Sequence, residues 1–255
     1  MNRDSLYFRK AKLVLRALSF LHDEKDFALH GGTAINFFVR DMPRLSVDID
    51  LTFLPITDRE TAASQISAML SRLLKRLQRT KGTVTAGGGP KSPRIITIEE
   101  DHVAIKVEAN FLFTGSIFPS EQREVCQSAQ ADLELSVEAN VLSVPELYGG
   151  KLCAAFDRQH PRDLFDIKLL LENEGITDEI RKSFIVYLVS HGRSMAEILD
   201  PNFIDLEKPF RSEFIGMTAK PVSLAGTPPI TNGLQMPPAT GCQNSRAKSQ
   251  PIPGE

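Results

Sequence analysis

Apolar and polar residues alternate strictly along residues 45–53. The odd-numbered positions are all apolar, and the even-numbered positions hold Ser46, Asp48, Asp50 and Thr52. Because successive side chains of a strand point to opposite faces, this period of two predicts a strand with one buried face. The two aspartates then point in the same direction from its other face.

The rest of the chain up to about residue 200 shows further periodic segments. Apolar runs predict strands at residues 27–30, 94–99 and 103–112, the last two as a hairpin, and helical spacing predicts helices at 6–21, 33–39, 57–79, 145–156, 161–172, 178–190 and 194–199. Gly31-Gly32 marks a tight turn after the first strand, and Thr33 is the expected N-cap of the helix that follows. Thr57 and Glu60 form the pattern of a capping box for the next helix.

The change from mixed strands and helices to helices alone predicts the domain organisation. We expect an α/β (α+β) fold, with a mixed sheet and flanking helices in residues 1–140 and a helical domain in residues 141–218. Residues 219–255 are predicted to be disordered, because the tail from residue 221 holds seven prolines, four glycines and no aromatic residue. This tail fits either a linker or the product of a shifted reading frame.

Composition limits the possible classes of protein. With 42% hydrophobic residues, 24% charged residues and a formal net charge of -2, the 255-residue chain is an ordinary globular protein and not a generally basic nucleic-acid binder. Cys126, Cys153 and Cys242 are too far apart for a zinc motif and odd in number, which favours a reducing compartment. No signal peptide or apolar run of about 20 residues is present, so we expect a soluble cytoplasmic protein.

The paired aspartates are the first candidates for chemistry. Asp48 and Asp50 have Cα atoms about 6.5–7 Å apart in a strand, which lets their carboxylates share a hard cation such as Mg²⁺. On a central strand, the two like charges would repel unless a cation neutralised them. Glu108, on the 103–112 strand, becomes a third carboxylate if that strand pairs beside the first. The simpler alternative is that all three decorate a solvated face.

Gly31, Gly32 and Thr33 precede these strands at a strand-to-helix turn. Glycines allow the backbone to approach a ligand closely, and N–H groups at a helix start attract phosphate. The hydroxyl of Thr33 then either caps the helix or contacts a phosphate oxygen. Taken alone, the two glycines also fit a plain turn, and His30 before them is better explained as a strand-end histidine with a satisfied partner than as a catalyst.

The spacing of these motifs resembles a known superfamily. Gly31-Gly32-Thr33, Asp48-Ile49-Asp50 and Val107-Glu108-Ala109 resemble the core signature of the DNA polymerase β-type nucleotidyltransferases. The surrounding residues 29–36, 44–50, 146–152 and 161–166 narrow the similarity to the AbiEii/AbiGii toxin family. The resemblance covers roughly residues 25 to 175.

This resemblance implies a metal-dependent nucleotidyltransferase that acts as the toxin of a toxin–antitoxin or abortive-infection system. Such enzymes transfer a nucleotide from a nucleoside triphosphate to an acceptor, in related members the 3′ end of tRNA, and imply a cognate antitoxin. Asp48, Asp50 and Glu108 would hold Mg²⁺, with Glu108 alternatively accepting a proton. Gly31, Gly32, Thr33, Lys151 and Arg162 would bind the triphosphate.

The last family motif is only partly matched. Asp163 and Asp166 agree with it, whereas Arg162 stands where the family usually has lysine and His160 where it usually has arginine. An arginine keeps the charge but not the geometry of a lysine. Asp163 and Asp166 are expected in the site, pairing with Lys151 or Arg162 or holding the acceptor nucleotide. Asp163 alternatively serves as a partner of the helix dipole.

Lys151 follows Gly149-Gly150 in an otherwise apolar helix. Small residues there allow either a triphosphate or another backbone to come close, and a lysine on that face would supply a point charge to phosphate oxygens. A lysine extending from the side of the helix into water is the alternative.

Residues 72–106 hold eight basic and three acidic residues, which fit an RNA-binding surface or a solvated helix face. Two rival functions stay open: an antibiotic-modifying type of small-molecule nucleotidyltransferase, and a non-catalytic nucleotide-binding module.

Overall fold

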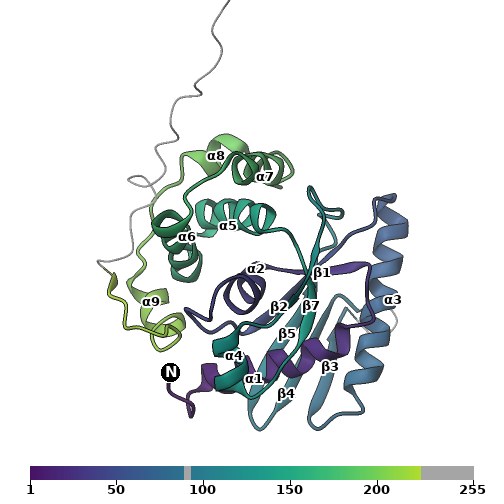
Figure 1. Ribbon diagram of the computed structural model, residues 1–255. Helices are drawn as coiled ribbons and strands as arrows, with labels where there is room; N and C mark the ends of the chain where they lie inside the picture. The colour runs from purple at the N-terminus through teal and green to yellow at the C-terminus, as the bar shows by residue number, and fades with distance from the viewer. Residues whose placement is uncertain (89–92, 225–255) are drawn as a thin grey trace, which may run out of the picture.

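The computed structural model describes residues 1–88 and 93–224. The described residues form a seven-stranded mixed sheet in the order β3-β4-β5-β2-β1-β7-β6 (Figure 1). The strands are β1 (Phe27–His30), β2 (Asp48–Phe53), β3 (Thr83–Gly87), β4 (Ile95–Glu100), β5 (Val103–Ala109), β6 (Glu121–Glu124) and β7 (Glu138–Val141). The tail predicted to be disordered spans residues 219–255, and its residues 225–255 lie outside the described residues, as does part of the expected glycine-rich loop at 87–90. Within the described part, the backbone N–H of Ala219 donates to the carbonyl oxygen of Pro43 at 2.9 Å.

Helices surround this sheet and form the C-terminal half. They are α1 (Leu6–Leu18), the 3₁₀ helix η1 (Ser19–Leu21), α2 (Gly31–Ala34), the π-helical η2 (Ile35–Val39), α3 (Arg59–Leu77), α4 (Gln127–Leu133), α5 (Val144–Arg158), α6 (Pro161–Asn173), α7 (Asp178–Val189), α8 (Met195–Leu199) and α9 (Glu207–Glu213). The predicted mixed α/β fold with flanking helices followed by helices is confirmed. The elements β3, β6, β7, α4 and α9 were not predicted from the sequence.

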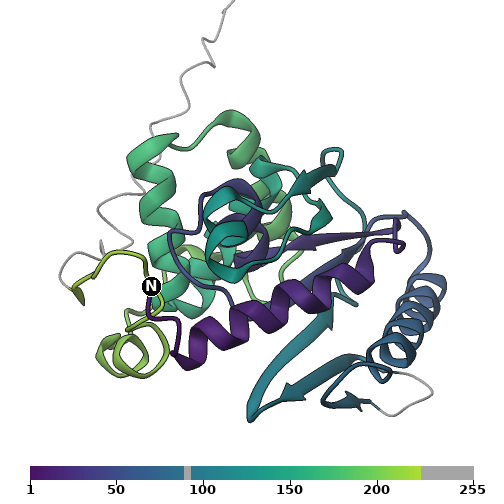
Figure 2. The ribbon, with the colours of Figure 1, turned by 60° about the horizontal axis from the view of Figure 1, so that its bottom comes forward.

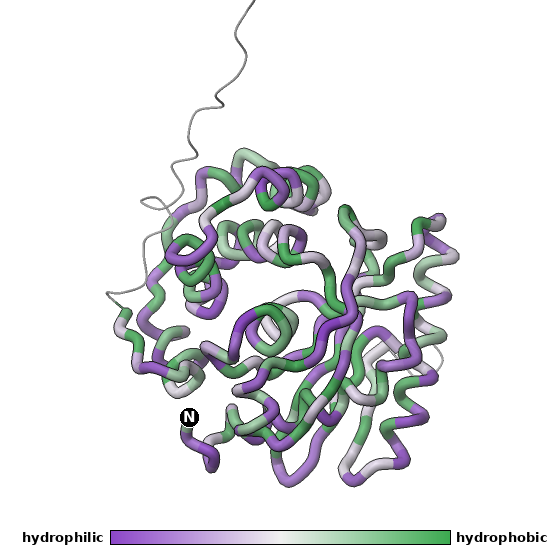
Figure 3. The backbone as a smooth tube through the Cα atoms, viewed as in Figure 1, coloured by the Kyte–Doolittle hydropathy of each residue, from purple (hydrophilic) through white to green (hydrophobic). Residues whose placement is uncertain are grey.

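Strand β2 lies at the centre of the sheet, between β1 and β5. It pairs antiparallel with β1 and parallel with β5. Its apolar residues Ile49, Leu51 and Phe53 are all buried, as the alternation predicts. Helix α1 packs against β5 and β2, and α3 packs against β3 and β4. Both helices bury apolar residues at helical spacing, and Figure 2 shows the two helices against the strands. In the hydropathy tube, hydrophobic and hydrophilic residues alternate along α3 (Figure 3). Burial of this apolar face orients the alternate, polar residues of β2 to the opposite face of the sheet.

The helical half packs on the sheet mainly through α2, because α5 and α6 contact α2, which in turn contacts β1 and β2. Helix α5 lies beside α7, and a Cβ atom at Gly149 would come within 2.5 Å of the Cβ of Ser183 and 2.7 Å of the backbone nitrogen of Phe184. The glycine is therefore needed for the close approach of another backbone, which is one of the two roles the sequence suggested. A single core cluster contains buried residues from both the sheet and these helices. The boundary proposed at residue 140 falls within β7.

Three local predictions are wrong in detail. Asp58, and not Thr57, caps α3, because its carboxylate accepts a hydrogen bond from the backbone N–H of Thr61 at 2.9 Å. Strand β2 begins at Asp48 and not at residue 45, because the backbone N–H of Leu45 donates to the carbonyl oxygen of Met217 instead (2.8 Å). Thr33 lies inside α2, which begins at Gly31.

Candidate active site

The structure brings the three candidate carboxylates together on one face of the sheet. In the parallel pairing of β2 with β5, Asp50 lies directly opposite Glu108, and Asp48 lies opposite Lys106. Adjacent strands are about 4.8 Å apart and alternate residues share a face, so these four side chains form a compact group. All four line one cavity of about 210 Å³, which we call the polar cavity.

Like charges and partial burial shape the electrostatics of this group. Burial raises the pKa of the Glu108 carboxyl, and the nearby negative charge of Asp50 raises it further, while Lys106 partly offsets the shift. The side chain of Asp48 is 44% exposed. Its Oδ2 lies 3.5 Å from Nη1 of Arg162, which is close enough for an ion pair. A carboxylate with a raised pKa among other acids is a typical setting for a proton acceptor or a cation ligand.

The two glycines of the turn are required by these neighbours. Gly31 has a φ of +73°, and a Cβ atom there would lie 2.6 Å from Oδ2 of Asp50. A Cβ atom at Gly32 would lie 2.7 Å from Nη2 of Arg44 and 3.2 Å from Oγ of Ser46. Glycine therefore gives room for the carboxylate and the guanidinium, and the backbone of Gly32 still lines the polar cavity.

Thr33 is placed differently from the expectation. Its side chain is fully buried, and its hydroxyl lies 2.5 Å from the carbonyl oxygen of Asp48, to which it donates, and 2.9 Å from the hydroxyl of Ser46. It does not cap the helix, whose N-cap is His30. The hydroxyl joins α2 to the start of β2 and thereby fixes the backbone from which the Asp48 carboxylate extends.

Lys151 is buried and lies between two aspartates of α6. Its Nζ is 2.9 Å from Oδ1 of Asp163 and 3.2 Å from Oδ2 of Asp166. Burial raises the pKa of Asp163, but the charges of Lys151 and Arg158 more than offset this, and the net pKa lies well below its usual range. Lys151 and Asp163 also line the polar cavity, so the ion pair is part of its wall.

Asp166 has a buried position behind this wall. Its carboxylate accepts hydrogen bonds from Nε of Arg44 at 2.8 Å, from Nη2 of Arg44 at 2.6 Å and from Nδ2 of Asn36 at 3.1 Å. The side chain is 0% exposed and is not among the residues that line the polar cavity. Asp166 is thus placed to hold Arg44 and Lys151 and not to touch a substrate.

Arg44 and Arg158 are site residues whose roles were not predicted from the sequence. Arg44 is 2% exposed, yet part of its side chain reaches the polar cavity. Arg158, in the last turn of α5, donates to both oxygens of Asp163, at 2.6 Å from Nε and 3.1 Å from Nη2. Its side chain is 61% exposed and lines the same cavity. The one available signal for Arg158 is its spacing of seven residues after Lys151, which places both on one side of a helix.

Arg162 and His160 show how the chain accommodates its departures from the family motif. Nδ1 of the His160 ring accepts a hydrogen bond from the backbone N–H of Arg162 at 3.1 Å, so His160 serves as the N-cap of α6. Its Nε2 lies 3.0 Å from the Glu213 carboxylate. Burial lowers the pKa of the ring, although Glu213 counteracts this shift. Arg162 itself keeps a cation in the polar cavity, next to Asp48.

A second cavity, of about 220 Å³, lies next to the first and is called here the apolar cavity. Gly32, Asp50, Lys151 and Arg158 line both cavities. The apolar cavity is otherwise lined mainly by α5 and α7, with His30 and Gly31 at the turn. His30 lies beside Asp50 through the antiparallel pairing of β1 and β2, and burial lowers the pKa of its ring.

The donor chemistry of the polar cavity fits a magnesium ion. Mg²⁺ prefers oxygen ligands and is usually held by one or two carboxylates together with substrate phosphates. Asp48, Asp50 and Glu108 offer such oxygens around one cavity. Within residues 1–88 and 93–224, no three His, Cys, Asp or Glu side chains lie so that they could hold a metal ion by themselves. A cation at this site would therefore need phosphate oxygens of the substrate among its ligands.

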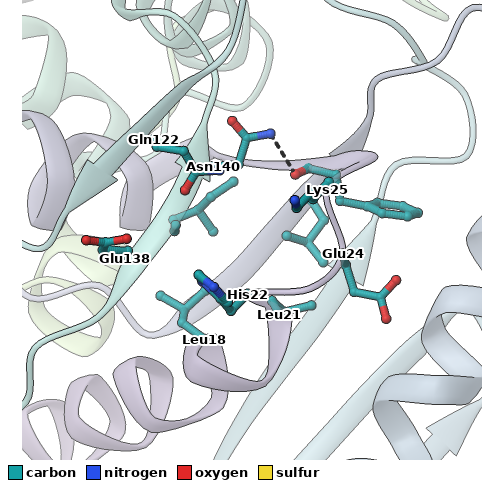
Figure 4. A pocket seen from close by; sticks show the side chains of 12 residues that line it. Leu18, Leu21, His22, Glu24, Lys25, Gln122, Glu138 and Asn140 are labelled. Carbon is teal, nitrogen blue, oxygen red and sulfur yellow. Dashed lines mark hydrogen bonds between the residues drawn. The ribbon is translucent and has the colours of Figure 1, made fainter.

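A third cavity of the described structure lies away from this site. A cavity of about 20 Å³ between η1 and the β6–β7 pair, with Asn140 donating to the carbonyl oxygen of Phe27, contains none of the predicted site residues (Figure 4).

The basic residues of the stretch 72–106 do not share one environment. Arg72 pairs with Glu24 at 2.6 Å, Lys106 lines the polar cavity, and Lys91 lies outside the described residues. None of the described helices is long and apolar enough to cross a membrane.

Two comparisons relate this chain to known proteins. The model of a family described as nucleotidyl transferase AbiEii toxin, type IV toxin–antitoxin system, matches residues 13–228. Among solved structures, MenT4, a nucleotidyltransferase toxin from Mycobacterium tuberculosis H37Rv, superposes with a TM-score of 0.64 at 15% identity, over 88% of this chain and 81% of that chain. At this identity the likeness is one of fold. No curated protein matches the sequence.

Proposed function

Since this chain belongs to the AbiEii family of nucleotidyltransferase toxins of type IV toxin–antitoxin systems, we propose that it transfers a nucleotide from a magnesium-bound nucleoside triphosphate to the 3′ end of a tRNA. The family establishes the class of enzyme. The metal, the nucleotide donor and the RNA acceptor are proposed here from the residues of the site. We further propose a cognate antitoxin and a cytoplasmic reaction, since nucleoside triphosphates and tRNA are both found in the cytoplasm.

The pairing of Asp50 with Glu108 carries this proposal. It places two carboxylates on neighbouring strands of a rigid sheet, with Asp48 two residues away on the same face. Lys151 and Arg162 line the same cavity from the opposite, helical wall. Acidic groups that hold a cation therefore face basic groups that hold phosphate, which is what transfer between phosphates requires. A module that only bound a nucleotide would not need the acidic wall.

The reaction follows from these positions. A hydroxyl oxygen of the acceptor attacks the α-phosphorus, the bond from that phosphorus to the β-phosphate bridging oxygen breaks, and pyrophosphate leaves. Glu108 accepts the proton of the attacking hydroxyl, for which its raised pKa is suited. Lys151 and Arg162, together with the backbone of Gly31 and Gly32, orient and neutralise the triphosphate.

Two further contributions complete the site. Bound Mg²⁺, held by Asp48 and Asp50, would neutralise charge on the phosphate oxygens. Thr33 and Asp166 act as positioning residues because both are buried and bonded to other site residues. Asp163 holds the two cations Lys151 and Arg158 at the cavity wall.

The basic groups in the polar cavity support an RNA acceptor. Besides the residues assigned to the triphosphate, Lys106 lines it from β5. Such a wall attracts the phosphates of a nucleic acid terminus. In the described part of the chain, the cavity is lined by five basic and four acidic side chains, so a cationic small molecule, such as many antibiotics, would meet a small excess of like charge there. The small-molecule acceptor is therefore the less favoured of the two.

The test is transfer of label from each α-labelled nucleoside triphosphate to total tRNA, with a panel of small molecules as the competing acceptors. We expect label on RNA, complete loss of it in Asp48→Ala, and wild-type labelling in Glu99→Ala, which changes an exposed acid on β4. Induced expression should arrest growth in the same pattern. Undiminished incorporation by Asp48→Ala would refute the site, and label only on small molecules would refute the acceptor.

A further inference from the structure

The polar and apolar cavities meet along one shared wall. Gly32 and Asp50 form the sheet side of that wall, and Lys151 and Arg158 form its helical side. Both cations are held in place by Asp163, at 2.9 Å from Nζ of Lys151 and 2.6 Å from Nε of Arg158. A chain of phosphates bound to these two cations would therefore have open space on both sides.

The two cavities differ in chemistry. Four charged side chains line the polar cavity and not the apolar one: Asp48, Glu108, Lys106 and Arg162. The apolar cavity instead has three aliphatic side chains and the ring of Tyr187 among its own lining residues, together with His30 and Glu146; the aliphatic residues are Leu142, Leu147 and Ala154. A planar, weakly polar group is suited to the second cavity, and a charged group to the first.

The aromatic ring of the apolar cavity is held rigidly. Tyr187 stacks on Phe113 with a centroid distance of 4.4 Å and an interplanar angle of 13°. Its hydroxyl lies 3.4 Å from Oε1 of Glu146, whose other oxygen accepts from the backbone N–H of Ile117 at 3.0 Å. A Cβ atom at Gly150 would lie 3.3 Å from Cε1 of the tyrosine ring. The absence of a side chain at Gly150 thus lets the tyrosine ring pack close to α5.

We propose that the apolar cavity binds the nucleoside of the donor triphosphate, while the polar cavity receives the hydroxyl end of the acceptor. This assignment rests on the proposed function. Glu108, the proton acceptor, lines the polar cavity alone, so the attacking hydroxyl must enter there. Asp50 lines both cavities, which places the α-phosphate at their junction. The base and ribose then fit in the apolar cavity on the far side of that junction, beside Ala154 and Tyr187.

The decisive test uses a ligand that has phosphates but no nucleoside. Binding of ATP, GTP, CTP, UTP and inorganic tripolyphosphate, each with Mg²⁺, is measured by calorimetry on the full chain. Ala154 is half-buried and lies one helical turn after Gly150, so Ala154→Leu fills the apolar cavity from its wall. Ala196→Leu adds the same group on an exposed face of α8 and serves as the matched control.

We expect Ala154→Leu to weaken every nucleoside triphosphate that the wild type binds by at least tenfold and to leave tripolyphosphate within twofold. Ala196→Leu should change neither. Unchanged nucleotide affinity, or an equal loss for both kinds of ligand in a folded variant, would overturn the cavity assignment. If Ala154→Leu does not fold, Ala154→Val applies the same comparison with less bulk. A wild type that binds none of these ligands would instead refute the proposed function, and the assignment with it.

A second pair of measurements separates the two cavities. Lys106 lines only the polar cavity, so Lys106→Ala should raise the KM for tRNA while leaving nucleotide affinity within twofold. Ala154→Leu should show the reverse pattern. A shift of nucleotide affinity in Lys106→Ala that matches its effect on tRNA would mean that the nucleoside occupies the polar cavity, which contradicts the assignment.

Discussion

The guanidinium of Arg44 and the carboxylate of Asp166 form a buried pair joined by two hydrogen bonds, at 2.8 Å from Nε and 2.6 Å from Nη2. Both side chains are almost completely withdrawn from water. The pair joins the segment before β2 to α6, and the guanidinium lies against Gly32. It therefore fixes the position of the glycine turn relative to the helical wall of the site.

Breaking this pair should destabilise the fold strongly. In Arg44→Met the buried Asp166 carboxylate loses its bidentate partner, which typically costs about 3–5 kcal/mol. The control is Arg211→Met, because Arg211 pairs with Glu207 on an exposed face of α9 and such pairs contribute about 0–1 kcal/mol. Urea unfolding measures both. Similar small losses in the two variants would show that the buried pair contributes little.

The same pair predicts how stability depends on pH. Burial raises the pKa of Asp166, but Arg44 and Lys151 more than offset it, and the net pKa lies below the ordinary 3.8. A depressed folded-state pKa adds stability that is complete above the unfolded value and is lost as the pH falls through the folded value. The unfolding free energy of the wild type should therefore exceed that of Asp166→Asn by a constant amount between pH 7 and pH 5, and this excess should shrink below about pH 4. An excess that shrinks between pH 7 and pH 5 would contradict this.

Gly31→Ala should abolish transfer through a clash with a catalytic group. The added methyl would lie 2.6 Å from Oδ2 of Asp50, at a φ of +73° that already disfavours alanine. Gly175 has a nearly identical φ of +72° with nothing within 4 Å, so Gly175→Ala isolates the backbone strain, about 1 kcal/mol. We expect transfer by Gly31→Ala to fall at least about 100-fold, since misplacement of a catalytic group by about 1 Å has that effect.

Thermal unfolding measures the stability that each glycine variant loses, so that a loss of transfer can be distinguished from a loss of folded protein. Gly175→Ala should lose a similar amount of stability to the strain alone and keep its transfer rate. Equal rates in the two variants would mean that the methyl at residue 31 does not displace the carboxylate.

Glu108→Gln should reduce the rate constant kcat and leave nucleotide binding nearly intact. The amide keeps the shape of the side chain but cannot accept the proton, and a positioned proton acceptor usually contributes about 10²–10⁴-fold. Glu99→Gln, on the exposed face of β4, is the matched change and should have no effect. Single-turnover kinetics at saturating nucleotide measure the step. A wild-type rate constant in Glu108→Gln would remove the glutamate from the mechanism.

Local patterns in the sequence predicted the elements that carry the acids. Alternation around Asp50 and Glu108 identified both strands, and their pairing placed the two residues side by side. The pair β6 and β7 escaped prediction because β6 reads Glu-Gln-Arg-Glu, an exposed strand at the edge of the sheet with no apolar alternation. Thr57 and Asp58 are both good N-cap residues, and the sequence pattern alone did not show that Asp58 caps α3.

The helical wall of the site was harder to predict because its contacts are long-range. Arg44 pairs with a residue 122 positions away, and no local pattern distinguishes it from a surface arginine. The burial of Asp166 is likewise a property of the assembled fold, since an i,i+3 aspartate pair on a helix is compatible with either exposure or burial. Thr33 was expected to cap a helix, but the carbonyl oxygen of Asp48 takes its hydroxyl.

The distance in sequence between Arg44 and Asp166 has a consequence for the timing of toxicity. A growing polypeptide contains the glycine turn and the acidic strands long before α6 leaves the ribosome. Until Asp166 arrives, the turn lacks its anchor, and the cations of α5 that we propose to bind phosphate lack the aspartates that orient them. An unfinished or prematurely terminated toxin should therefore be harmless to the machinery that is making it.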